Sequence, residues 1–219
     1  MADLEFYFDP VCPFAWMTSK WVRLVASQRA LDVDWRFISL RYINGALDYD
    51  TSFPEGYERQ HTSGLELLRI AHAVRETAGN EGVGRLYEAL GRHIFETSPS
   101  RRNELTLNTA SFVVPILEEL GYSPSLQDAY ADTSADATIQ QESDYALSLT
   151  GRDVGTPILH FNPPHGTALF GPVISRLPSP EDAVQLWDHV EGLSRFEGFA
   201  ELKRSLRETP QLPIYQDRS

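Results

Sequence analysis

The sequence is poor in cysteine and in long apolar runs, and each shortage excludes a class of protein. Its 219 residues contain one cysteine, Cys12, so no disulfide can form within the chain and no cysteine-cluster zinc site can be built. The longest uninterrupted apolar run is the four residues Phe14 to Met17, far short of the roughly 20 that span a bilayer. We therefore expect no membrane-spanning segment.

Positive charge is also scarce. The chain has 19 Lys and Arg against 31 Asp and Glu, a formal net charge of −12. Such an excess of negative charge repels nucleic acid over long distances. The opening Met-Ala-Asp-Leu-Glu also lacks the basic and apolar regions of a secretory signal. We expect a cytoplasmic protein that binds neither nucleic acid nor membranes.

The N-terminal region alternates between strand and helix patterns. Apolar and polar residues alternate in residues 4–8 and again from 33 to 40, which predicts two strands. Between them, apolar spacings of three and four predict a helix that Pro13 opens. This order predicts a parallel β–α–β unit with a right-handed crossover. Ligands of such units bind where a strand ends and a helix begins, which is the position of Cys12.

The middle of the sequence is mainly helical by pattern. Residues 42–54 are rich in turn formers and predict an irregular segment. The glycine-rich stretch 79–84 lacks the preceding strand of a nucleotide loop and predicts a connection between helices. Pro115 should kink its helix or mark the start of it, and Gly121 suits a C-cap. The expected helical segments are 65–74, 83–94 and 108–121, with two short ones beginning near Ser123 and Ser134.

Strand patterns return near the C-terminal end. Residues 158–161 and 168–170 are short apolar runs, and the Asn-Pro-Pro-His-Gly between them predicts a β-hairpin. A helix follows, with Ser179 as its N-cap and acidic residues in its first turn. The predicted order is therefore βαβ, a helical block, and ββα, which is an α/β architecture.

Three motifs carry a resemblance to a known family. They are Phe-Asp-Pro-Val-Cys-Pro-Phe-Ala-Trp (8–16), Asp-Val-Gly-Thr-Pro (153–157) and Phe-Gly-Pro-Val-Ile-Ser (170–175). The chain resembles the DsbA-like thioredoxin-fold oxidoreductases, specifically the mycothiol-dependent nitroreductase family of actinobacteria, over nearly its whole length. The resemblance implies a thioredoxin-like domain in residues 1–53 and 150–219, with an inserted α-helical domain in residues 54–149.

The resemblance also implies a site around Cys12. A thiolate at a helix N-terminus is stabilised by free backbone N–H groups and the helix dipole, which lower a cysteine pKa from about 8.5 to roughly 3.5–7.5. An ordinary X–Pro bond is trans, but in this family a Thr-Pro with a cis bond faces the cysteine. Cys12 is thus the expected catalytic residue, and the expected thiol-binding residues are Pro13, Phe14, Ala15, Trp16, Thr156 and Pro157.

One departure from the family concerns the residue three after the cysteine. Well-known members resemble Cys-Pro-Trp-Cys, whereas this chain has Ala15 in place of the second thiol. A mixed disulfide on Cys12 can then be opened only by a thiolate of another molecule. We expect no tightly bound cofactor, mycothiol or a similar small thiol as cosubstrate, and disulfide or nitro-type electrophiles as substrates. The resemblance leaves a homodimer open.

Several alternatives stay open beside this interpretation. A transferase or isomerase similar to the kappa-class glutathione transferases also dispenses with the second thiol, and a redox-inactive thioredoxin-fold binding module is a third reading. Cys12 itself could be a buried, inert cysteine. The histidines show neither a protease signature nor a recognised metal-ligand spacing, so a cysteine hydrolase and a metal site are disfavoured. Phe14 and Trp21 share the apolar stripe of their helix and favour core positions, whereas Trp16 lies off it.

Overall fold

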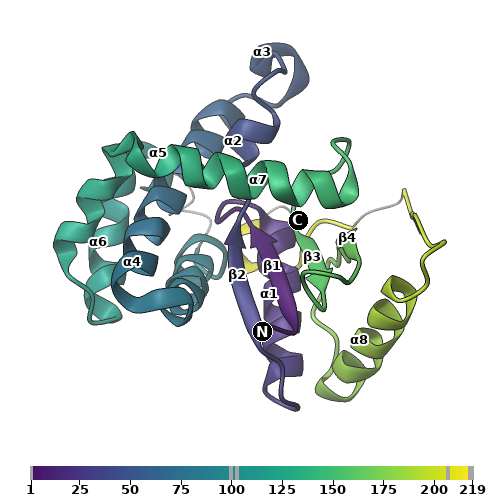
Figure 1. The fold of residues 1–219 in the computed structure, drawn as a ribbon. Helices are drawn as coiled ribbons and strands as arrows, with labels where there is room; N and C mark the ends of the chain where they lie inside the picture. The colour runs from purple at the N-terminus through teal and green to yellow at the C-terminus, as the bar shows by residue number, and fades with distance from the viewer. Residues whose placement is uncertain (1, 99–100, 102–103, 206–207, 217–219) are drawn as a thin grey trace. The chain divides into compact units, whose positions relative to one another are not determined.

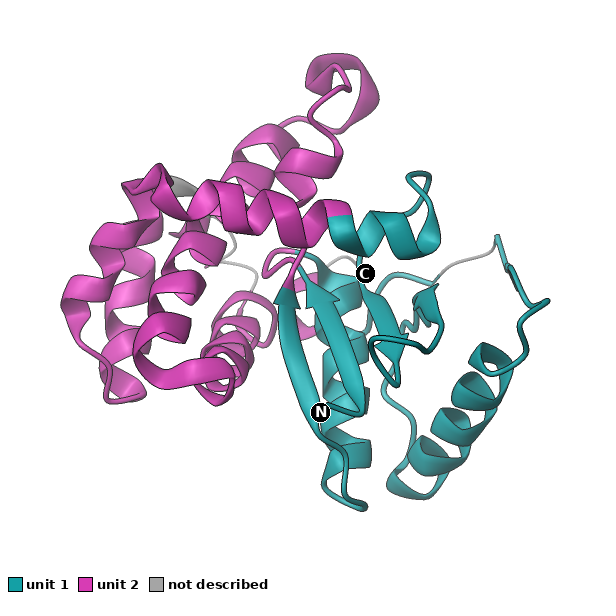
Figure 2. Ribbon diagram, viewed as in Figure 1, with its two compact units in different colours: residues 1–8, 12–36, 145–211 teal, residues 9–11, 37–144, 212–219 magenta. Residues whose placement is uncertain are grey.

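The computed structural model describes residues 2–98, 101, 104–205 and 208–216, shown as a ribbon in Figure 1. Its contacts divide the chain into two compact units, coloured in Figure 2. Unit 1 comprises residues 1–8, 12–36 and 145–211, and unit 2 comprises residues 9–11, 37–144 and 212–219.

Unit 1 is built on a β-sheet, whose strands are β1 (Leu4–Phe8), β2 (Val33–Phe37), β3 (Ile158–Phe161) and β4 (Ala168–Phe170). Their order across the sheet is β2-β1-β3-β4. β1 and β2 point the same way in Figure 1, and α1 (Pro13–Ala26) connects them. β3 is antiparallel to both β1 and β4. The predicted β–α–β unit and the predicted hairpin are both confirmed.

The helices α1 and α8 (Pro180–Ser194) pack together in unit 1 through tryptophans. Trp21 is fully buried, and its indole N–H donates to the Ala183 carbonyl at 2.9 Å. The Trp21 and Trp187 rings lie 5.5 Å apart between centroids. Ser179 caps α8 by accepting from the Asp182 N–H, as its sequence predicts.

The alternation in β1 separates an apolar face from a polar face, yet all five residues are buried. On the polar face, the Glu5 carboxylate accepts from the Tyr7 hydroxyl at 3.0 Å and from His160 Nδ1 at 2.8 Å. Arg36 of β2 donates to the other Glu5 oxygen at 3.2 Å. Burial, and then the Glu5 charge, raises the pKa of Tyr7 well above its usual range. The polar side of this strand is therefore a buried hydrogen-bonded network and not a solvated face.

Unit 2 is helical in its described residues. Gly79 interrupts α4 (Tyr57–Phe95) with φ 67° and ψ −167°, so this long element consists of two helical halves, as the two predicted stripes require. Gly121, with φ 76°, ends α6, and Tyr122 N–H reaches back to the Leu117 carbonyl at 2.8 Å. Pro115 lies inside α6. The elements are α2 (Leu40–Ile43), α3 (Tyr49–Ser52), α4 (Tyr57–Phe95), α5 (Glu104–Leu107), α6 (Thr109–Glu119), η2 (Pro124–Ala131), η3 (Thr133–Ala135), α7 (Asp136–Thr150, whose last residues belong to unit 1) and η4 (Pro213–Tyr215).

Two predictions about residues 33–54 are wrong. The second strand, predicted to continue to Leu40, ends at Phe37. Side chains accept the backbone hydrogen bonds at this end of the strand: Glu142 accepts from the Phe37 N–H and Ser143 accepts from the Ser39 N–H. The stretch 42–54, expected to be irregular, contains the end of α2 and all of α3, and Asp48 caps α3 by accepting from the Asp50 N–H.

None of the helices in the described part of the chain combines the length and the apolar character needed to cross a bilayer.

Candidate active site

Cys12 is the N-cap residue of α1. Its backbone is extended (φ −85°, ψ 113°), and its carbonyl accepts the first helical hydrogen bond, from Trp16 N–H at 3.0 Å. Pro13 starts the helix without losing a bond, because its missing N–H would have no helical partner. The Ala15 N–H donates to Cys12 Sγ at 3.4 Å. The sulfur therefore receives one of the free N–H groups of the helix N-terminus.

The Thr-Pro motif lies against the same sulfur within unit 1. The Cys12 thiol donates to the Thr156 carbonyl at 3.4 Å, and the Thr156-Pro157 peptide bond is cis. The Thr156 hydroxyl donates to the Tyr7 carbonyl of β1 at 3.1 Å, and Gly171 N–H donates to the Pro157 carbonyl at 2.9 Å. Residues from β1, the Thr-Pro loop and β4's end thus meet at the start of α1.

The structure brings the sequence-predicted residues together with different exposures. Pro13 and Phe14 are half-buried, whereas Ala15 and Trp16 are buried at 0% and 2% exposure. Cys12 itself is 8% exposed, and Thr156 and Pro157 are buried. Phe14, expected in the core, is thus the more accessible aromatic ring, while Trp16, off the apolar stripe, is covered and has Lys20 Nζ 5.9 Å from its ring centroid.

Two contacts of the Cys12 sulfur act in opposite directions on its ionisation. The Ala15 N–H can donate to a thiolate and stabilises it, whereas the Thr156 carbonyl accepts only from a protonated thiol. Both protonation states therefore have a partner at this place. The chain holds no other cysteine, so any second sulfur must come from another molecule.

Asp9 is a feature of this region that the sequence reading missed. It was read as part of a turn that ends the first strand, but its carboxylate is fully buried and accepts from Val11 N–H at 3.0 Å and from Leu40 N–H at 2.7 Å, all within unit 2. Burial raises its pKa to about 7, against the lowering effect of these two bonds. The available signal was an acid in the otherwise apolar stretch before Cys12.

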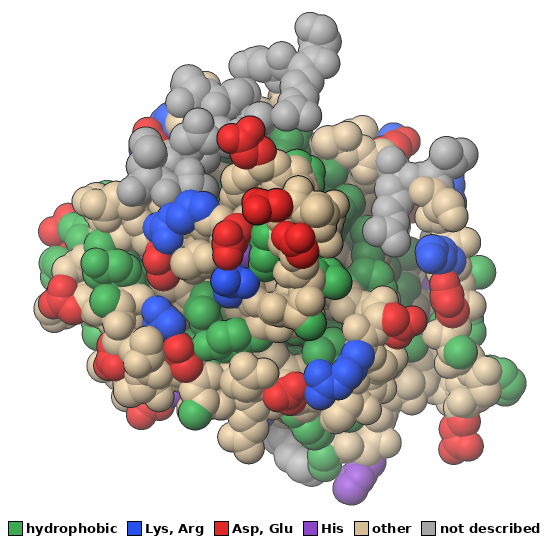
Figure 3. Space-filling view, turned by 90° about the horizontal axis from the view of Figure 1, so that it is seen from above, with side chains coloured by type: hydrophobic (Ala, Val, Ile, Leu, Met, Phe, Trp, Pro, Cys, Tyr) green, Lys and Arg blue, Asp and Glu red, His purple; other side chains and the backbone are tan. Residues whose placement is uncertain are grey.

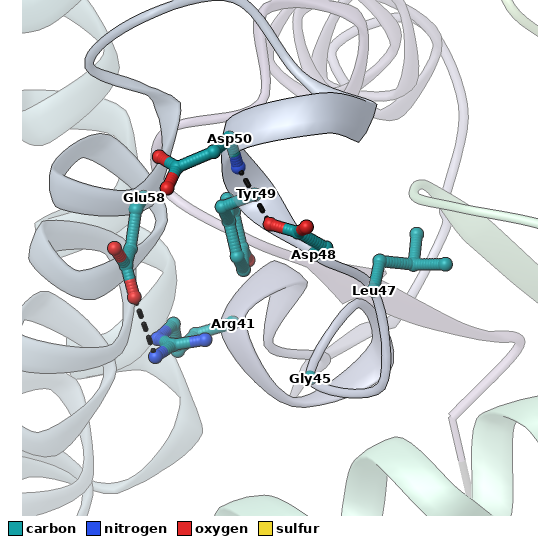
Figure 4. A pocket seen from close by; sticks show the side chains of 7 residues that line it. All are labelled: Arg41, Gly45, Leu47, Asp48, Tyr49, Asp50 and Glu58. Carbon is teal, nitrogen blue, oxygen red and sulfur yellow. Dashed lines mark hydrogen bonds and ion pairs between the residues drawn. The ribbon is translucent and has the colours of Figure 1, made fainter.

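A polar hollow lies in unit 2, around α2 and α3 (Figure 4). It has a volume of about 310 Å³, and Arg41 donates to Glu58 across it at 3.0 Å. Asp and Glu side chains gather near the middle of the face in Figure 3, on the side where α3 lies in Figure 1. The lining residues are Arg41, Gly45, Leu47, Asp48, Tyr49, Asp50 and Glu58.

His61 and His160 serve as packing and hydrogen-bonding residues. His61 Nδ1 lies 2.9 Å from the Tyr49 hydroxyl, and burial, followed by the charge of Arg41, lowers its pKa to about 4. His160 is fully buried on Glu5. Within the described residues, no group of three or more His, Cys, Asp or Glu side chains is arranged to hold a metal ion.

Comparison with known proteins gives consistent similarities. The family model described as Rv2466c-like, mycothiol-dependent nitroreductase Rv2466c, matches residues 11–204. The uncharacterized protein Rv2286c of Mycobacterium tuberculosis is 31% identical over 206 residues, which are 93% of this chain and 82% of that protein.

Solved structures resemble the fold at low sequence identity. The cytosolic disulfide reductase DsbM from Pseudomonas aeruginosa is 15% identical, with a TM-score of 0.54 over 87% of this chain and 98% of that one. The probable DsbA oxidoreductase SCO1869 from Streptomyces coelicolor is 15% identical, with a TM-score of 0.52 over 95% of this chain and 94% of that one. These likenesses establish the DsbA-like thioredoxin fold with its added helices.

Proposed function

Because the chain belongs to the Rv2466c-like mycothiol-dependent nitroreductase family, and is therefore a thiol oxidoreductase, we propose that Cys12 is its one catalytic sulfur and that mycothiol is its cosubstrate. The resemblance carried by the motifs at 8–16, 153–157 and 170–175 is thereby confirmed. The observation that carries the proposal is the position of Cys12 Sγ, 3.4 Å from both the Ala15 N–H nitrogen and the Thr156 carbonyl oxygen.

The residues of the proposed site have separate roles. Cys12 is the nucleophile, and the Ala15 N–H stabilises its thiolate. Thr156 and Pro157 present extended backbone beside the sulfur, where a thiol substrate can form strand-like hydrogen bonds. Pro13 and Phe14 are accessible enough to contact a bound thiol, and the buried Trp16 supports the helix turn beneath them.

The proposed cycle for a disulfide substrate uses two molecules of mycothiol. The Cys12 thiolate attacks one sulfur of the substrate, the substrate S–S bond breaks, and one half leaves as a thiolate. A first mycothiol thiolate attacks Cys12 Sγ and releases the second half, which leaves mycothiol bound to Cys12. A second mycothiol thiolate attacks the mycothiol sulfur, so that mycothiol disulfide forms and the Cys12 thiolate returns. Two thiols are oxidised and one disulfide is reduced.

A nitro-type substrate needs the same two electrons. One mycothiol and Cys12 together supply two electrons and two protons, which convert a nitro group into a nitroso group and one water while a Cys12–mycothiol disulfide forms. A second mycothiol thiolate then attacks the mycothiol sulfur of that disulfide, so that mycothiol disulfide forms and the Cys12 thiolate is released. The resolving step is thus shared by both substrate types.

The remaining expectations complete the proposal. We assign residues 1–53 and 150–219 to a thioredoxin-like domain and residues 54–149 to an inserted helical domain, which fits the location of the sheet and of α4 to α6. We place the protein in the cytoplasm, where thiols are kept reduced. Its partners in this proposal are a small thiol and an electrophilic substrate, with no tightly bound cofactor.

Intact-mass measurement after treatment with mycothiol disulfide tests the proposal. We expect one mycothiol adduct on the wild type and none on Cys12→Ser. Ala15→Cys supplies a thiol next to the sulfur and should replace the adduct by a loss of two hydrogens. Ala26→Cys, at the opposite end of α1 about 20 Å away, is the matched control and should keep its Cys12 adduct.

Other outcomes identify the rival functions. A thioether of mycothiol with the electrophile, accumulating in place of mycothiol disulfide, would show a transferase similar to the kappa class. Absence of an adduct together with unchanged behaviour of Cys12→Ser would show a redox-inactive binding module. Either result overturns the monothiol cycle.

A further inference from the structure

The loop that leads into Cys12 contains the carboxylate of Asp9, which is buried away from water. Asp9 is 0% exposed, and its two oxygens accept from separate backbone N–H groups, Val11 at 3.0 Å and Leu40 at 2.7 Å. Burying a carboxylate is unfavourable unless its hydrogen bonds repay the loss of water. The carboxylate thus joins the residue before Cys12 to the first residue of α2.

Helix α4 packs against this carboxylate at Gly64. A Cβ at Gly64 would lie 2.5 Å from Asp9 Oδ1 and 2.9 Å from Val11 Cγ2, so the backbone of α4 packs directly on the loop. A glycine inside a helix is less favourable than alanine, and the close approach of the loop explains why one stands here. Residues 9–11 are therefore enclosed within unit 2 from two sides.

We propose that Asp9 is a positioning residue for Cys12, because its carboxylate fixes the backbone of the three residues that lead directly into the thiol. Cys12 receives the Ala15 N–H only while its own backbone keeps the extended conformation of an N-cap. The Val11 N–H bond to Asp9 sets the path of the chain immediately before that cap. Asp9 acts through this path and not by touching a substrate; the inference rests on the proposed role of Cys12 as nucleophile.

Two variants weaken this arrangement in different ways. Asp9→Asn keeps the size of the side chain but offers one acceptor oxygen, so its amide N–H₂ meets one of the two backbone N–H groups. Leu40→Pro removes the other donor and keeps the Asp9 charge. Proline suits that position, because Leu40 is the first residue of α2 and Ser39 before it is already extended (φ −96°, ψ 118°).

The measurement is the second-order rate of Cys12 alkylation by iodoacetamide as a function of pH, on samples shown to be folded by near-ultraviolet circular dichroism. If the Ala15 N–H bond to the thiolate is weakened when the path of residues 9–11 is loosened, the midpoint of the rate profile should rise by about one pH unit in Asp9→Asn and by at least about half a unit in Leu40→Pro. Asp132→Asn is the matched control, because Asp132 makes the same kind of bond to Ser134 N–H at 2.9 Å on the exposed surface. Its rate should stay within about twofold of the wild type.

The possible results separate the mechanisms. Unchanged midpoints in folded Asp9→Asn and Leu40→Pro would overturn the proposal and leave Asp9 a purely structural residue. A lower midpoint in Asp9→Asn with no change in Leu40→Pro would also overturn it, because Asp9 would then act on the thiolate through its charge. If Cys12→Ser still abolishes the mycothiol adduct in either case, the proposed function stands without this inference.

Discussion

The buried carboxylate of Asp9 should make the stability of the protein depend on pH between 4 and 7. Asp9 is fully buried, and burial outweighs its two backbone hydrogen bonds, so its pKa is raised from 3.8 to about 7. A carboxyl group with a raised pKa holds its proton more tightly in the folded chain than in the unfolded chain. Between pH 3.8 and about 7 the folded state therefore binds more protons than the unfolded state.

The sign and the size of the effect follow from this difference. Stability falls with rising pH wherever the folded state binds more protons, so the contribution of Asp9 is fully present below pH 3.8 and is lost as the pH rises to about 7. A difference of about three pKa units, at about 1.4 kcal/mol each, gives a loss of about 4 kcal/mol in the free energy of unfolding. Above pH 7 the contribution is constant.

Urea unfolding of the wild type and of Asp9→Asn from pH 4 to pH 8 measures this effect. Because the other titrating groups are common to both proteins, the difference between their unfolding free energies isolates Asp9, and we expect it to change by about 4 kcal/mol in favour of Asp9→Asn as the pH rises. Asp132→Asn is the control: hydrogen bonds from Ser134 lower the pKa of the exposed Asp132, so its contribution changes only below pH 3.8 and the difference from the wild type should stay nearly flat from pH 4 to pH 8. A wild-type minus Asp9→Asn difference that stays flat across this range would refute the reasoning.

Two further predictions concern buried rings. Burial is the main reason that the pKa of His61 is lowered to about 4, so the stability that its neutral ring contributes is lost as the pH falls from 6.5 to 4. The imidazole carbon resonance of His61 should therefore titrate with a midpoint near 4. A midpoint near 6.5 would contradict the burial of this ring. Trp21→Phe removes the indole N–H that donates to the Ala183 carbonyl at 2.9 Å in the core of unit 1, so urea unfolding should show a decrease of about 2 kcal/mol in the free energy of unfolding. Trp187→Phe should decrease it less, because the Trp187 N–H donates to the Glu191 carboxylate on its own helix. Equal decreases would contradict this ranking.

Periodicity and cap residues predicted the framework because they act locally. The alternation in β1, the proline that starts α1 and the serine that caps α8 each depend on neighbours within a few residues. The end of β2 was missed for the opposite reason. The groups that remove its N–H donors, Glu142 and Ser143, are about 100 positions further along the chain, and no local pattern shows them.

The same distinction applies to the candidate site. Cys12 could be predicted because it follows a strand and begins a helix, and its neighbour Thr156 could be named only through the resemblance to a family. Asp9 was read as a turn residue, since an aspartate before a proline usually is one. Its burial depends on Leu40 and on Gly64, so its raised pKa comes from tertiary packing and not from the turn.

Ala15 determines how long a mixed disulfide on Cys12 would last. In a dithiol site the second cysteine attacks at the high effective concentration of a group on the same helix turn, so resolution is independent of the external thiol. Here the Ala15 methyl group occupies that position and its backbone N–H contacts Cys12 Sγ at 3.4 Å, so the resolving thiolate must come from solution. The lifetime of the proposed mixed disulfide is then inversely proportional to the concentration of the small thiol. In the proposed cycle, turnover therefore depends on the concentration of the external thiol, while the Ala15 N–H remains available to stabilise a Cys12 thiolate.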